Sequence, residues 1–301
     1  MATVSGTLKT FDQVGKKEDI EDIIYQISPT KTPFISNIGT SKAQNTLHQF
    51  QTLELAAVGT NAKVEGADAG NASEQTTTML NNHTQIFDKV VQTSGTADAV
   101  GTYGRGKEHK LQVLNAGLEL RRDMEHAMVG AGQAGTAGNN TTARQLKSAQ
   151  NFIDSATTST AGANRAFTET ILEEVLLKCY NEGGEPNLVM VTPSHSKIVN
   201  GFASSSDGSR NRDFSTGTTV VNAVDVYQSS FGKVSIVLNR FLDANTVLAL
   251  DTSYWSRAVL RPMQTIQLAK TGDSDKKQLL TEQTLVCKSP KASGLAKALT
   301  A

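Results

Sequence analysis

The sequence contains little cysteine, few aromatic residues and no excess of charge of either sign. Its 301 residues include two cysteines and one tryptophan, and aromatic residues make up 5% of the chain. Cys179 and Cys287 have no second cysteine or histidine at ligand spacing, so neither a disulfide framework nor a zinc site is indicated. Both lie among apolar neighbours, so we interpret them as buried structural thiols.

The charge balance limits the partners that the chain can have. Lys and Arg together number 29, and so do Asp and Glu. The chain therefore lacks the excess of basic residues that drives phosphate binding and counterion release. The equal numbers disfavour sequence-specific nucleic-acid binding. The first thirty residues lack the apolar core of a signal peptide, and no segment approaches the length of a membrane span. We therefore expect a protein made in the cytosol, without a membrane partner.

Isoleucines near the N-terminus form an amphipathic pattern. Ile20, Ile23, Ile24 and Ile27 repeat at helical spacing, and Ser28-Pro29 ends the run. A helix of about twelve residues is marginal in water, so this stripe must dock on another surface. The extended connector that follows would let it lie on this chain or on a neighbouring copy. We therefore predict an N-terminal arm.

Residues 44–96 have the pattern of a long hairpin. Two strand-like runs, Leu47–Leu55 and Met79–Val91, flank a tip rich in Gly, Ala, Asn and Thr. At ~3.3 Å per residue, about twenty residues each way would project ~60 Å, which an isolated two-stranded ribbon does not sustain. Either the segment is a flexible loop, which its composition favours, or another chain supports it.

The middle of the chain changes to helical periodicity and then to mixed structure. Residues 104–128 place apolar residues, including Val113, Leu114 and Met124, on one broad arc, and the glycines from Gly130 end the helix. Residues 130–166, rich in small and polar residues, are either a domain boundary or a loosely packed loop. Then follow a helix at 167–180, a strand at 187–192 and a helix at 193–202, with an exposed loop at 203–217. Strands are predicted at 247–250, 255–268 and 279–287, so the chain has mixed α/β character.

One segment resembles a phosphate-binding loop. Gly101–Lys107 fits the pattern G-x-x-x-x-G-K, and the Val247–Asp251 run resembles the strand and acid that would complete such a site. Glu108 stands where the pattern requires the Ser or Thr that holds magnesium, and its carboxylate would repel the phosphates. A nucleotide-binding enzyme therefore remains only an alternative interpretation.

Other chemical signals favour structural interpretations. Gly130–Gly135 matches a dinucleotide fingerprint, but it follows a helix instead of a strand, so we read it as a loop. Glu119, Asp123 and His126 share a helix face, for which solvation or salt bridges between copies are favoured over a metal site. The remaining histidines stand alone, and no nucleophile elbow is present. We therefore predict no enzyme activity, no catalytic, cofactor-binding or metal-binding residues, and no cofactor.

Four segments, in order and spacing, resemble one known family. They are Asp19–Gly39, Gly104–Glu108 with Glu119–Asp123, Pro186–Phe202 and Leu250–Pro290. They resemble the major capsid proteins of tailed bacteriophages related to that of phage SU-ten, which have the Hong Kong 97-type fold. Gln49-Phe50 departs from the acidic residue and Trp of relatives.

This resemblance implies an α+β, Hong Kong 97-like capsid fold in four parts. They are an N-terminal arm at 1–43, an extended loop (β-hairpin) at 44–100, a peripheral domain with a spine helix at 101–145 and 245–301, and an axial domain at 146–244. It reverses the preference for a flexible loop at 44–96. Because the arm already starts at Asp19, we expect any scaffold to be a separate protein.

The resemblance also implies a function. It is that of a major head protein, a structural protein that self-assembles into the icosahedral shell of a bacteriophage virion. Its partners would be other copies of itself, in hexamers and pentamers, together with a portal, and a scaffold or decoration proteins where these exist. The shell would enclose double-stranded DNA without sequence-specific binding and would assemble in the bacterial host cytoplasm. An encapsulin-type compartment shell is the alternative with the same fold.

Overall fold

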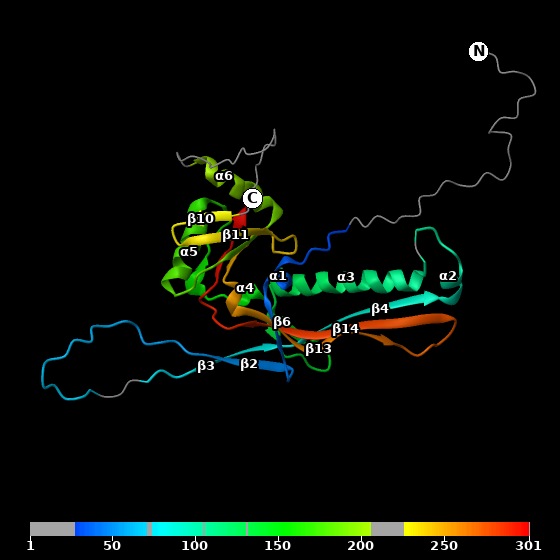
Figure 1. Ribbon diagram of the computed structural model, residues 1–301, viewed down its shortest axis with the longest axis horizontal. Coiled ribbons are helices and arrows are strands. Elements are labelled where there is room, and N and C mark those ends of the chain that lie inside the picture. The colour runs from blue at the N-terminus through cyan, green and yellow to red at the C-terminus, as the bar shows by residue number, and fades with distance from the viewer. Residues whose placement is uncertain (1–27, 71–73, 105, 131, 206–225, 301) are drawn as a thin grey trace, which may run out of the picture.

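We describe the fold from a computed structural model, which covers residues 28–70, 74–104, 106–130, 132–205 and 226–300 (Figure 1). The helix predicted at Ile20–Ile27 and nearly all of the loop predicted at 203–217 lie outside these ranges. Within them, helices and strands are mixed, which confirms the predicted α+β class. No helix in the described ranges is long and apolar enough to span a membrane.

One layer of the molecule is a long four-stranded sheet. Its order is β1 (Gly39–Lys42), β13 (Trp255–Gln267), β14 (Ser274–Cys287) and β4 (Gln85–Ser94), with β1 parallel to β13 and the other pairs antiparallel. The register of β13 shifts on both sides of Arg261, and Pro262 lies within the shifted stretch. A proline has no N–H to donate to a ladder, which accounts for an irregularity there.

A single long helix lies along this sheet (Figure 1). α3 runs from Glu108 to Val129, so the predicted helix at 104–128 is confirmed with a later start. Ala116, Leu120, Met124 and Met128 are buried in one apolar cluster with Phe87, Val91, Leu279 and Leu285 of the sheet. Gly130 caps the C-terminal end of α3, and an added Cβ there would lie 1.8 Å from the Phe241 carbonyl oxygen, so this close approach requires glycine.

A six-stranded sheet forms the second layer. Its order is β10 (Val226–Ser229), β11 (Gly232–Leu238), β9 (Leu188–Val191), β12 (Val247–Leu250), β15 (Gly294–Ala296) and β7 (Thr158–Ser159). β9 and β12 are uninterrupted apolar runs because they are buried on both faces. Helices α5 (Glu169–Asn181) and α6 (Pro193–Ser205) pack against this sheet. They correspond to the helices predicted at 167–180 and 193–202.

The predicted hairpin is confirmed as β2 (Leu47–Thr52) paired antiparallel with β3 (Thr78–His83). The single strand predicted at Met79–Val91 is wrong, because it is interrupted at Thr84 and continues as β4, which pairs with β14 in the four-stranded sheet. Short elements complete the fold. The helices are α1 (Pro33–Asn37), α2 (Gly95–Ala99) and α4 (Ala149–Phe152), with 3-10 turns at Ser155–Thr157 and Thr252–Tyr254. The paired strands are β5 (Ala134–Thr136) with β6 (Gln145–Lys147) and β8 (Arg165–Ala166) with β16 (Leu299–Thr300).

The six-stranded sheet combines strands from two of the predicted domains. β12 and β15, from the segment predicted as peripheral, share this sheet with β9 and β11 from the segment predicted as axial. The four-part domain division stays a prediction.

The expectation of a loosely packed loop within 130–166 is wrong for residues 146–159, whereas no described residue of 132–145 or 160–166 is buried. Leu146, Ala149 and Phe152 are buried in the main core. The amide side chain of Gln150 donates to the Val129 carbonyl at 2.7 Å, and that of Asn151 donates to the carbonyls of Gly132 and Gln133. Polar side chains therefore satisfy the irregular backbone while a few apolar residues anchor it.

Candidate assembly surfaces

The extended loop projects from the body of the molecule, with the short pair β2 and β3 at its base and a long open loop beyond them (Figure 1). The described residues between β2 and β3 are all exposed. Four of them are large apolar side chains, with 56% of Leu53, 89% of Leu55, 104% of Val58 and 82% of Val64 accessible. Apolar side chains exposed along one projecting segment mark it as a surface for contact with another molecule.

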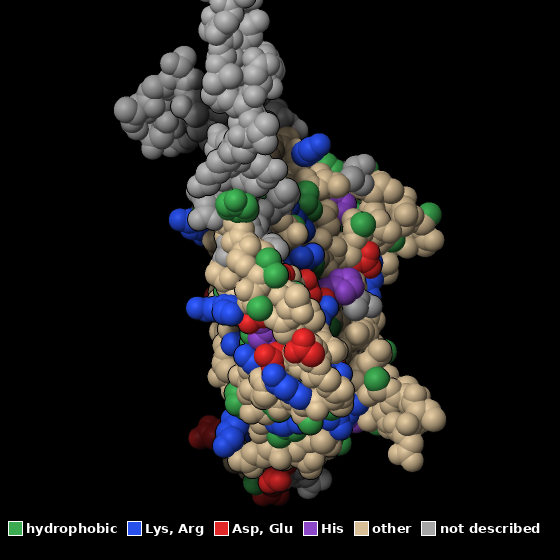
Figure 2. All heavy atoms as spheres, turned by 90° about the vertical axis from the view of Figure 1, so that its right-hand side faces the viewer, with side chains coloured by type: hydrophobic (Ala, Val, Ile, Leu, Met, Phe, Trp, Pro, Cys, Tyr) green, Lys and Arg blue, Asp and Glu red, His purple; other side chains and the backbone are tan. Residues whose placement is uncertain are grey.

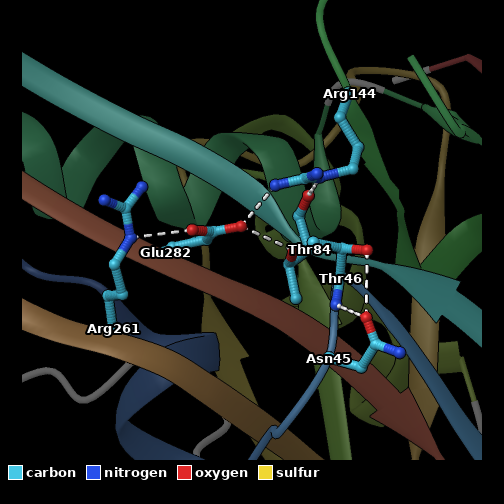
Figure 3. Close-up of polar contacts among 6 residues, drawn as sticks. All are labelled: Asn45, Thr46, Thr84, Arg144, Arg261 and Glu282. Carbon is cyan, nitrogen blue, oxygen red and sulfur yellow. Dashed lines mark hydrogen bonds and ion pairs between the residues drawn. The ribbon is translucent and has the colours of Figure 1, made fainter. Parts of the chain in front are cut away.

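A buried carboxylate joins the root of this loop to the sheet (Figure 3). Glu282 on β14 is 4% exposed and accepts hydrogen bonds from Thr84, Arg144 and Arg261. The Thr84 hydroxyl and Arg144 share Oε1, and Arg261 donates to Oε2 at 2.8 Å. A buried carboxylate needs such partners because desolvation alone would cost several kcal/mol.

The same cluster fixes the two chain segments that enter the loop. Arg144 also donates from Nε to the Thr84 carbonyl at 2.6 Å, and the Thr84 amide donates to the Thr46 carbonyl at 2.8 Å. Asn82, one of the last residues of β3, donates to the carbonyls of Lys147 and Leu285 and accepts from the Lys147 amide. The loop therefore leaves a fixed root, although its described tip is exposed.

A second buried carboxylate lies where the arm meets α3. Glu125 is fully buried, and its oxygens accept from the amides of Phe34 and Ile35 at 2.7 and 2.9 Å. The Asn239 side chain donates to the same carboxylate at 2.7 Å. Burial is the largest cause of the raised pKa of Glu125, and the hydrogen bonds partly offset it.

Further apolar residues are exposed on the four-stranded sheet and on α3. Ile86 and Val90 alternate with Phe87 and Val91 along β4, so they point away from α3. Leu114, which we placed on the buried arc of the helix, is 61% exposed. These residues add to the surface that packing against another molecule would cover.

The candidate phosphate loop lies in a different context from a nucleotide site. The Gly101–Lys107 segment joins α2 to α3, whereas the motif requires a strand before its loop. The Lys107 ammonium bonds the Asp98 carbonyl at 2.9 Å and pairs with its carboxylate at 3.5 Å. Glu108 accepts from Gln112 within the first turn of α3. Lys107 therefore ties α2 to the start of α3.

The other residues considered as chemical groups also have structural partners. Lys89 pairs with Asp123 at 3.1 Å and with Glu119 at 3.7 Å, and His126 contacts the Phe241 carbonyl. No group of His, Cys, Asp and Glu side chains in the described part of the chain is arranged to hold a metal ion. Gly130–Gly135 leads from α3 into β5, so it lacks the strand before the loop that a dinucleotide site needs.

Both cysteines and His195 are buried away from solvent. Cys179 and Cys287 are fully buried and unbridged, as expected, and burial raises the pKa of each thiol to about 12. His195 is fully buried beside Thr192, and burial lowers the pKa of its imidazole. A thiol that stays protonated is a poor nucleophile. The prediction that the chain has no catalytic residues stays a prediction.

Figure 2 views the end of the molecule where α2 and the far ends of β4 and β14 lie. Lys and Arg side chains are interspersed there with Asp and Glu side chains. This agrees with the equal totals of basic and acidic residues in the sequence. Such a face offers no concentrated positive field to a polyanion.

Comparison with known proteins identifies relatives over nearly the whole chain. Residues 3–300 match the family model described as SU10 major capsid protein. The major capsid protein of Escherichia phage Phieco32 is 29% identical, over 95% of each chain.

Solved structures share the fold at low sequence identity. The capsid asymmetric unit of cyanophage A-1(L) matches with a TM-score of 0.73 at 11% identity, covering 97% of this chain and 99% of that one. The SrpI encapsulin of Synechococcus elongatus matches with a TM-score of 0.59 at 8% identity, covering 95% and 92%.

Proposed function

The chain belongs to the SU10 major capsid protein family, and from this premise we propose how its copies build the shell. It is a structural protein of an icosahedral virion capsid with the Hong Kong 97-like fold. Copies associate as hexamers and pentamers, which close into a head around packaged double-stranded DNA. Assembly takes place in the bacterial host cytoplasm, with a portal and, where they exist, separate scaffold or decoration proteins.

The observation that carries this proposal is the extended loop. Its root is fixed by Glu282 and Asn82, whereas its described tip exposes Leu55, Val58 and Val64. Only six residue pairs join β2 to β3, and the described residues beyond them belong to no strand and are exposed, so the order of the loop depends on a neighbour. In a capsomer, that neighbour is the next copy of the same chain.

The balanced charge of the chain suits a wall around DNA. With 29 basic and 29 acidic residues, the subunit has no net charge to neutralise phosphates. The interior surface would then enclose DNA without holding it tightly. The same property disfavours sequence-specific binding.

Two alternatives remain distinguishable by experiment. The encapsulin has the same fold but a lower TM-score than the cyanophage capsid, and the family model is that of a phage protein. For a nucleotide-binding enzyme, Lys107 would have to leave Asp98 to reach a phosphate. We propose that the chain has no enzymatic activity.

Electron microscopy of purified assemblies tests the proposal. We expect closed icosahedral particles with hexameric and pentameric capsomers, and nuclease-resistant double-stranded DNA inside particles from infected cells. Particles filled with a protein cargo and free of DNA would instead support the encapsulin alternative. ATP hydrolysis that Lys107→Ala abolishes would contradict a purely structural role.

A further inference from the structure

The first turn of α1 has no cap of its own. Thr32 is the N-cap residue, but its side chain makes no capping hydrogen bond, and Pro33 occupies the first helical position. The amides of Phe34 and Ile35 are the donors that an N-cap side chain normally satisfies. Phe34 is fully buried and packs edge-on against Trp255, so these donors have no access to water without displacing the core.

The missing cap is supplied by Glu125, 91 positions along the chain from Phe34. Oε1 accepts from Phe34 and Oε2 accepts from Ile35, so each oxygen is used. Arg121, one turn earlier on α3, reaches the Thr32 hydroxyl at 3.4 Å. α3 therefore holds the beginning of α1 through two side chains on one of its faces.

The same carboxylate also holds the chain that follows β11. Asn239 donates to Oε1 at 2.7 Å while its own backbone amide donates to the Val191 carbonyl of β9. Its side-chain oxygen accepts from the Phe241 amide at 2.9 Å. The buried side chain of Glu125 therefore joins three parts of the molecule: α1 at the end of the N-terminal arm, α3 and the six-stranded sheet.

We infer that Glu125 is the positioning residue that fixes the direction in which the arm enters the body and couples it to the segment after β11. An ionised carboxylate suits this role because it accepts at both oxygens. A glutamine of the same size accepts at one atom only, so one of the three donors would face an NH₂ group. The consequence for shell assembly rests on the proposed function, whereas the coupling within one subunit does not.

Glu125→Gln tests the inference in unassembled subunits, with Glu119→Gln on the exposed face of the same helix as the matched control. We expect amide hydrogen exchange to accelerate roughly tenfold at residues 34–38 and at 239–242, because leaving one buried donor unpaired costs on the order of the 1.4 kcal/mol that a tenfold change represents. The rest of the body should exchange as in the unmodified protein, because removing a buried charge offsets part of the loss. Glu119→Gln should change neither segment.

Asn239→Ala provides a second test that keeps the carboxylate. It removes one donor to Oε1, and the inferred coupling requires exchange at residues 34–38 to accelerate as well. Unchanged exchange at 34–38 in both variants, or an equal acceleration across the whole body, would overturn the inference. If exchange rises locally but the Glu125→Gln protein forms normal shells, the positioning role stands and the proposed role of the arm in assembly fails.

Discussion

Two buried carboxylates in this subunit are stabilised in different ways. Glu282 is surrounded by two guanidinium groups and a hydroxyl, whereas Glu125 receives only neutral donors and has a raised pKa. Opposite charges offset the cost of burial more fully than neutral hydrogen bonds do. Glu282 therefore stabilises the packing at the root of the extended loop, whereas Glu125 fixes the orientation of the N-terminal arm on α3.

We predict that Glu282→Gln lowers the free energy of unfolding of the subunit by roughly 1–3 kcal/mol. One arginine would face an NH₂ group, and both would lose their buried counter-charge, although their partial exposure lets water compensate in part. Urea denaturation of unassembled subunits measures this change. Glu119→Gln, which removes an exposed partner of Lys89, is the control and should cost less than about 0.5 kcal/mol. Equal stability of the two variants would contradict the assigned role of Glu282.

At the level of residues, the sequence predicted what depends on local pattern. The burial of Cys179 and Cys287 followed from their apolar neighbours and is confirmed. The roles of Glu125 and Glu282 depend on residues that are distant in the sequence. Phe34 lies 91 positions from Glu125, and Arg144 lies 138 positions from Glu282. The periodicity of a sequence does not reveal such pairs. A signal was present, because Glu125 lies between Met124 and Ala127 on the buried face of α3, where a lone acid needs a partner.

At the level of elements, the long periodic segments were predictable and the compact irregular ones were not. α3 and the β2–β3 hairpin follow from their apolar patterns. The segment 130–166 packs against the core through Leu146 and Phe152. These few apolar residues form no recognisable pattern among the small and polar residues that surround them in the sequence. Leu114 fits the apolar arc of α3 and yet lies on its exposed side. A pattern shows that a residue needs covering, and not which molecule covers it.

We predict that the order of the extended loop depends on assembly. Hydrogen exchange across residues 56–78 should be fast in unassembled subunits, because the described residues of this segment are exposed. In assembled shells, contacts with the neighbouring copy should slow it markedly. The buried α5 segment, with Leu172 and Leu176 in the core of its sheet, serves as the internal reference and should exchange alike in both states. Equal exchange of residues 56–78 in both states would show that the loop is not an assembly element.

At the level of the whole molecule, stability and assembly are assigned to different regions. One core lies between α3 and the four-stranded sheet and continues onto one face of the six-stranded sheet through Met190, Leu248 and Leu295. A second core lies between the other face of the six-stranded sheet and α5. The extended loop, in contrast, exposes Leu55, Val58 and Val64. A subunit built in this way folds from its own contacts and leaves specific surfaces for its neighbours. On the face shown in Figure 2, basic and acidic side chains are mixed.

We predict that unassembled subunits bind double-stranded DNA weakly and with little dependence on salt. Because 29 basic residues are matched by 29 acidic ones, few counterions should be released, and the slope of log K against log salt should correspond to fewer than about two phosphate contacts. Fluorescence anisotropy with a labelled duplex between low and moderate salt measures the slope. Glu119→Lys combined with Asp123→Lys, which reverses two exposed charges beside Lys89, should steepen it and so proves the assay sensitive. A slope equivalent to four or more contacts in the unmodified subunit would mean that one face concentrates positive charge, and the shell would then hold its DNA by attraction as well as by enclosure.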